Sequence, residues 1–207
     1  MEHDHALTLK WLNWWHRDFW LQADPGWHQQ RLASLPLAQQ QLFLRQHAAV
    51  WQRALGIPSA SPGQPQPLIL SIADLSLTAR QLLLDLVAEI CGCATPLDAQ
   101  LKIWCRRLAK GLRPAGWLPA PLYATGQPAD SLLLLQALWP DLWPRLELLF
   151  PPPMVVQYRD PPLLLPASRL RPLWEAALWQ SQRHSDLHPL SSENNVDTQK
   201  DHSAERQ

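Results

Sequence analysis

Cysteine and histidine side chains could bind a metal ion or act as nucleophiles in this 207-residue chain, which has three of the former and eight of the latter. Cys91 and Cys93 are separated by one residue, whereas the paired cysteines of zinc knuckles are separated by two to four. Cys105 is isolated in a predicted helix, and the "HDH" of residues 3–5 lies at a chain end, where fraying is common. We therefore expect no metal site, and we interpret the cysteines as small buried side chains.

Short catalytic motifs are the next signal to consider. The sequence has no G-x-S-x-G, H-E-x-x-H, G-x-x-x-x-G-K-[ST] or G-x-G-x-x-G. With seven glycines, the chain offers no phosphate-binding loop. These observations predict a protein that is not an enzyme and uses no cofactor. Catalytic carboxylate pairs leave no sequence signature, so a small helical enzyme with such a site remains an alternative.

His28 lies in the stretch "DPGWHQQRLASLP" at residues 24–36. It has no cysteine, carboxylate or second histidine at the spacing of a metal site or a catalytic triad. The first three residues predict a turn in which the Asp24 side chain accepts backbone N–H bonds. Trp27 then serves as a packing residue or partner anchor, and a short helix runs on towards Pro36. We interpret the stretch as a structural joint.

The segment "KIWCRRLAK" at residues 102–110 combines a tryptophan with four cations. Its spacing is typical of a solvated helix face opposite an apolar stripe. If this face binds a partner, an acidic protein surface fits better than RNA, because the formal net charge of the chain is zero. We therefore expect no nucleic acid partner.

Apolar spacing favours helices along most of the chain. We predict helices over about 44–55, over 76–91, from Thr95 as N-cap to a stop at Pro114, from Ser131 to before Pro140, from Asp141 to the prolines at 151–153, and after Ser168. The run "LILSI" at 68–72 is the one strand-like segment. The predicted fold class is therefore all-α, an irregular multi-helix bundle with Pro-rich connectors and room for one short strand or hairpin.

A Pro-rich connector at 57–67 is expected to divide the chain. Residues 1–183 are predicted to form one helical domain, with an N-terminal lobe at about 1–56 and a main body at 68–183. The polar residues 184–207 are expected to form a disordered tail.

Tryptophan is unusually common, with 12 residues against three Phe and two Tyr. In "WLNWWHRDFW" at residues 11–20, the five large aromatic residues cannot share one helical stripe. Some of them are then exposed and mark a partner site, with Trp14 and Trp15 as candidates, or the segment is buried on several sides. The sequence leaves both outcomes open.

The chain shows no signal-peptide pattern, because acidic residues occupy the amino end. Its longest apolar runs fall far short of the about 20 residues that span a bilayer. We expect a cytoplasmic protein with reduced thiols and no direct membrane insertion.

Two stretches together resemble the SctK family, which includes OrgA and MxiK and consists of accessory proteins of the type III secretion sorting platform. The first is residues 24–36, where an Asp-Pro, an aromatic residue, His-x-x-Arg-Leu and a proline follow one another. The second is "LWPDLWPRLELLFPPP" at 138–153, with an arginine in an apolar helix before Leu-Leu-Phe-Pro-Pro. The resemblance covers residues 20–155 in patches, and Gln29 replaces the proline that follows the histidine in the family.

This resemblance implies a mostly helical, non-enzymatic adaptor at the cytoplasmic side of the inner-membrane base of the secretion apparatus. Its partners would be the cytoplasmic domain of an SctD-like ring protein and an SctQ-like pod protein, with SctL and the ATPase SctN contacted indirectly. A secretion chaperone or regulatory binding module is the main alternative. The candidate partner-binding or family-motif residues are Trp14, Trp15, Trp27, His28, Arg31, Leu32, Arg145, Leu149 and Phe150.

Overall fold

The computed structural model describes residues 2–32, 35–36, 38–40, 42, 52–53, 56–124, 126–155 and 161–187. Within these ranges every regular element is helical and no strand occurs, so the predicted all-α class is confirmed. The helix predicted at 44–55, apart from two residues, and the tail after residue 187 lie outside this part. None of the helices described combines the length and apolar content needed to cross a lipid bilayer.

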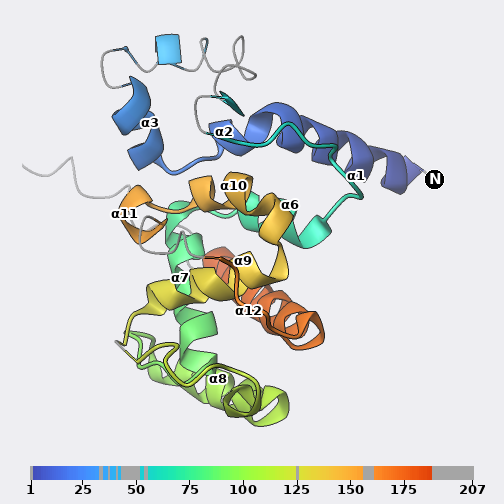
Figure 1. Ribbon diagram of the computed structural model, residues 1–207. Helices are drawn as coiled ribbons and strands as arrows, with labels where there is room; N and C mark the ends of the chain where they lie inside the picture. The colour runs from blue at the N-terminus through green and yellow to red at the C-terminus, as the bar shows by residue number, and fades with distance from the viewer. Residues whose placement is uncertain are drawn as a thin grey trace, which may run out of the picture.

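The helices are joined by short turns and by longer irregular segments, such as 57–66 and 161–166 (Figure 1). In chain order they are α1 (Glu2–Asn13), the π-helical η1 (Trp14–Asp18), α2 (Phe19–Leu21), α3 (Pro25–Leu32), α6 (Pro67–Ala73), α7 (Leu77–Ile90), α8 (Ala99–Leu112), η2 (Pro114–Gly116), η3 (Pro128–Asp130), α9 (Ser131–Leu138), η4 (Pro140–Leu142), α10 (Trp143–Leu146), η5 (Glu147–Leu149), α11 (Pro152–Val155) and α12 (Ala167–Leu187).

Helix α7 is the centre of the main body, and α8, α9 and α12 all pack against it. It begins as predicted at Ser76, whose hydroxyl accepts the Ala79 N–H at 3.2 Å and so caps the helix. Most of its residues are buried, including Leu83 and Val87. In Figure 1 it runs through the middle of the molecule, with α8 at one end and α1 to α3 at the other.

The strand suggested for residues 68–72 is wrong, because these residues form α6. Pro67 opens this helix at a position where its missing N–H costs nothing. Nearly every residue of the segment is buried, so its sequence reads as a continuous apolar run. Such a run has no periodicity that could distinguish a short buried helix from a strand.

Helix α8 begins later than predicted. Its N-cap is Asp98, whose carboxylate accepts the Leu101 N–H at 2.8 Å, and not Thr95. The backbone N–H and the hydroxyl of Thr95 instead donate to the Glu89 carboxylate, at 3.0 and 2.7 Å. Because its hydroxyl is bound to Glu89, Thr95 fixes the turn between α7 and α8 and does not cap the helix.

The helix predicted from Asp141 to the prolines is divided into η4, α10 and η5. Prolines at the first positions of η4 and α10 remove backbone donors and break the segment into single turns. Phe150 is extended, but a helical turn resumes at Pro152 as α11. At the other end of the main body, α12 continues to Leu187, so residues 184–187 are helical and do not belong to the predicted tail.

The five aromatic residues of the tryptophan-rich segment are all buried, with at most 3% of any of them exposed. The π-helical turn η1 explains how. A π turn inserts one extra residue into the helical register, which rotates everything after it back by about 100°. Phe19 and Trp20 therefore return to the side occupied by Trp11 and Trp14. The second of the two sequence-based outcomes, burial of the segment, is the one observed.

The N-terminal helices and the main body share one apolar core. The same cluster of buried side chains contains Trp11 and Trp27 from the N-terminal segment and Leu83, Phe150 and Trp174 from the rest of the chain. The N-terminal segment is therefore fixed against the main body by direct packing.

Candidate functional site

Two segments that are distant in sequence meet in one place, which we call the joint: residues 24–32 and residues 145–152. The Asp24 N–H donates to the Leu148 carbonyl at 2.7 Å. The indole N–H of Trp27 donates to the carbonyl of Phe150, 123 residues away, at 2.9 Å. The Asp24 carboxylate accepts the Gly26 N–H at 2.8 Å, which confirms the predicted turn. The two stretches that carry the family resemblance are thus in direct contact.

The turn at Gly26 allows this close approach. A Cβ atom at Gly26 would lie 2.8 Å from Cδ of Pro152 and 2.9 Å from the Asp24 carboxylate.

We expect Gly26→Ala to lower the free energy of unfolding by about 1–3 kcal/mol, because the added methyl group overpacks the joint. Gly111 is the matched control: a Cβ there meets nothing within 4 Å, so Gly111→Ala should stabilise α8 by up to about 1 kcal/mol. Denaturant unfolding measures both, and a neutral Gly26→Ala would contradict the close packing.

Arg145 is the first residue of the second segment of the joint, and 1% of its surface is exposed. Its Nε donates to the Trp15 carbonyl at 3.2 Å, and a terminal nitrogen donates to the Pro58 carbonyl at 3.4 Å. The guanidinium carbon lies 3.8 Å from the centre of the Trp15 ring, within range of a cation–π interaction. Burial lowers the pKa of Arg145 to about 10, so it stays charged at neutral pH. In the part of the chain that the structure describes, no carboxylate pairs with it.

Arg80 of α7 holds the other side of the joint, and the sequence analysis did not select it. One of its terminal nitrogens donates to the carbonyls of Gln22 (3.0 Å) and Leu149 (2.9 Å), and the other donates to Ala73 (2.8 Å). Burial lowers the pKa of Arg80, against the charges of Asp24 and Asp74. A signal was present in the sequence, since Arg80 lies four residues before the buried Leu84 and so interrupts the apolar face of α7.

The predicted site residues fall into three groups. Most are buried in the core or the joint, so they stabilise the fold and present little side-chain surface to a partner: Trp14, Trp15, Trp27, Leu32, Arg145, Leu149 and Phe150. His28 is half-buried, with its Nε2 2.8 Å from the Trp20 carbonyl and its ring 5.0 Å from that of Trp20. Arg31 lies in α3, and its side chain is outside the described part.

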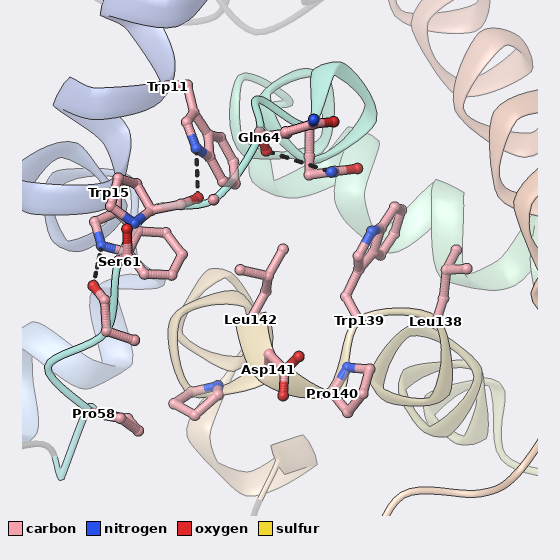
Figure 2. A pocket seen from close by; sticks show the side chains of 15 residues that line it. Trp11, Trp15, Pro58, Ser61, Gln64, Leu138, Trp139, Pro140, Asp141 and Leu142 are labelled. Atoms are coloured by element: carbon pink, nitrogen blue, oxygen red, sulfur yellow. Dashed lines mark hydrogen bonds between the residues drawn. The ribbon is translucent and has the colours of Figure 1, made fainter.

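A groove of about 660 Å³ opens next to Arg145, between the Pro-rich connector and the turn that contains η4. The indole N–H groups of Trp11 and Trp15 donate to the carbonyls of Pro62 (2.8 Å) and Ala60 (3.2 Å) and hold the connector in place as one wall. Figure 2 shows Trp139 and Leu142 projecting from the opposite wall into the space.

The groove suits binding better than catalysis. The described residues that line it are mainly tryptophan, proline and leucine, and Asp141 is the one ionisable residue among them. Acid–base chemistry usually needs two ionisable groups whose environments separate their pKa values. An apolar groove with a few polar backbone groups instead fits an apolar segment of another molecule.

The cysteines show no sign of activation. Burial raises the pKa of Cys91 and that of Cys105 to about 12, and it also raises that of Cys93. A thiol with a raised pKa is a poor nucleophile at neutral pH. Among the described residues, no group of three or more His, Cys, Asp or Glu side chains lies where it could hold a metal ion.

Comparison of the chain with family models, with curated proteins and with solved structures finds no match.

Proposed function

We propose that the protein is a non-enzymatic adaptor of the bacterial type III secretion sorting platform. It would lie at the cytoplasmic face of the inner-membrane base and link the cytoplasmic domain of an SctD-like ring protein to pods that contain an SctQ-like protein. SctL and the ATPase SctN would be reached through the pods.

The joint is the observation that carries this proposal. The resemblance to the SctK family rests on two short motifs, and each motif is weak when taken separately. In the structure, Asp24 and Trp27 of the first motif bond directly to Leu148 and Phe150 of the second. A structural reason for the two motifs to occur together supports reading them as one family pattern.

The apolar groove supports a protein-binding role over the alternatives. Small secretion chaperones usually combine helices and strands, whereas every regular element in the described part of this chain is helical. A hidden carboxylate site would need a second ionisable group beside Asp141 in the groove lining. We place one of the two partner contacts in the groove, where Leu142 is half-buried and accessible.

Co-purification tests the proposal. The full-length chain, expressed with the SctD-like cytoplasmic domain and separately with the SctQ-like protein of the same operon, should retain at least one of them through size-exclusion chromatography. We expect Leu142→Glu to weaken that complex by about tenfold or more, because it buries a carboxylate in an apolar contact.

Leu164→Glu is the matched control, because Leu164 is fully exposed on the segment before α12. It introduces the same charge away from the groove and should leave the complex intact. Failure of the folded wild-type chain to bind either partner would overturn the adaptor proposal. If both substitutions weakened the complex equally, the groove would not be the partner contact, and that part of the proposal would be wrong.

A further inference from the structure

Helix α8 concentrates cations, and the acidic residue nearest to them in sequence is its N-cap Asp98, one turn before Lys102. Residues 99–113 contain five Lys or Arg side chains and no Asp or Glu: Lys102, Arg106, Arg107, Lys110 and Arg113. The salt bridges of the described chain join Lys10 to Asp74 and Arg17 to Asp18, and none involves α8. The chain as a whole is neutral, so this helix concentrates positive charge that is balanced elsewhere on the molecule.

The five cations occupy one face. At 100° per residue they fall within an arc of about 140°, and from residue 102 to residue 113 they extend about 16 Å along the axis. Ile103 lies inside the same arc and is 44% exposed. We call this surface the basic face: Lys102, Ile103, Arg106, Arg107, Lys110 and Arg113.

The helix macrodipole explains only part of this pattern. Cations near a helix C-terminus are stabilised by the dipole, which accounts for Lys110 and Arg113. Lys102 lies in the first half of α8, where the dipole gives a cation no advantage. Arg113 also adopts a left-handed conformation, with φ of 50° and ψ of 58°, where glycine would be less strained. The chain thus keeps a cation at the end of this face against a local conformational preference.

The opposite side of α8 packs against the core. Leu101 and Cys105 are buried against the core, and Trp104, Leu108 and Leu112 pack partly against it. Binding to a lipid surface requires an apolar face free to enter the headgroup region, and Ile103 is the one large apolar side chain that the basic face offers. Single-stranded nucleic acid requires exposed aromatic rings for stacking, and the basic face has none.

We propose that the basic face of α8 binds an acidic helix of a protein partner. The complementary helix would carry carboxylates three and four residues apart, which the arginines can bind through two parallel hydrogen bonds, and an apolar side chain to cover Ile103. The basic face lies at the end of the molecule remote from α1 to α3 (Figure 1), so it is separate from the groove. The proposal does not depend on the secretion assignment.

A synthetic peptide provides the test. The probe is a fluorescent helical peptide of alanine and glutamate, with glutamates three and four residues apart and one central leucine. Fluorescence anisotropy with the full-length protein should show binding that weakens as salt is added, since the contact is electrostatic. Arg106→Glu combined with Arg107→Glu should weaken binding by about tenfold or more.

Arg169→Glu combined with Arg183→Glu is the matched control, because it makes the same change in net charge at exposed positions of α12. This variant should bind the peptide as the wild type does. Equal loss in both variants would mean that only net charge matters and would overturn the proposal. Binding to phosphatidylserine vesicles or to oligothymidylate in preference to the peptide would assign the face to lipid or nucleic acid and would also overturn it. Because this probe contains no secretion protein, its outcome is independent of the co-purification result.

Discussion

Replacing Arg145 with alanine is expected to lower the free energy of unfolding by about 3 kcal/mol. The substitution leaves a cavity and removes the donors of the Trp15 and Pro58 carbonyls. It also removes the cation–π contact with Trp15, worth about 2 kcal/mol at a desolvated site. These losses exceed the gain from no longer burying a charge, which is real but smaller. Denaturant unfolding followed by circular dichroism measures the difference.

Two further substitutions at Arg145 separate the contributions. Arg145→Lys keeps the charge but cannot hold two carbonyls in a planar fork or stack on the indole, so we expect about half of the alanine effect. Arg145→Met keeps most of the volume and removes the guanidinium donors, at about 1–3 kcal/mol for each carbonyl that stays buried without another partner. A methionine variant as stable as the wild type would show that the guanidinium makes no net contribution.

The contribution of Arg145 should not depend on pH in the neutral range. Burial lowers its pKa from the ordinary value of 12.5 to about 10, so below about 10 the group is protonated in both the folded and the unfolded state. Between these two values the unfolded state binds more protons, and the share of the unfolding free energy due to this group rises with pH. The effect of Arg145→Ala should therefore be the same at mildly acidic and at neutral pH.

Replacing Trp27 with alanine is expected to cost about 4 kcal/mol, the usual scale for truncating a buried tryptophan. Trp27 is 4% exposed, and its indole N–H bonds to the Phe150 carbonyl across the joint. Trp27→Phe keeps most of the apolar area but loses the donor, so about 1–2 kcal/mol is expected. Thermal and denaturant unfolding of the wild type and the two Trp27 variants measures their relative stabilities.

His28→Ala is the control for this prediction, because His28 neighbours Trp27 and is only half-buried. Losing its contact with the Trp20 carbonyl should cost about 1 kcal/mol. A larger effect for His28 than for Trp27, or loss of a bound metal in the His28 variant, would contradict the interpretation of residues 24–36 as a structural joint.

Local structure was predictable where capping and periodicity agreed. Helix α7 begins at Ser76 and α9 at Ser131 as the sequence indicates, and the turn at Asp24 forms the predicted hydrogen bond. Two of the errors share a physical cause, which is that a contact outside the predicted element outweighed a local preference. Thr95 bonds to Glu89 and does not cap a helix, and the apolar run at 68–72 is surrounded by core on several sides.

The joint and the groove could not be located from the sequence. Trp27 and Phe150 are 123 residues apart, and nothing local indicates that one donates to the other. The groove has the connector as one wall and Trp139 and Leu142 in the other. The sequence predicts a connector for the first wall and the adjoining ends of two helices for the second, and no pattern shows that the two walls face each other. The π turn at Trp14–Asp18 was also hidden, because the aromatic spacing alone fits exposure as well as burial.

The bonds from Trp11 and Trp15 to the connector have a consequence for shortening the chain. An amino-terminal helix is often a candidate for removal, because deleting it usually leaves the elements after it intact. Here Trp11 and Trp15 supply the donors for the Pro62 and Ala60 carbonyls, and the Trp15 carbonyl accepts a bond from Arg145. A chain that lacks α1 would lose the Trp11 donor. A chain that lacks both α1 and η1 would lose all three bonds. Trp11 and Trp15 thus anchor one wall of the groove, and removing residues 2–18 would leave that wall without these anchors.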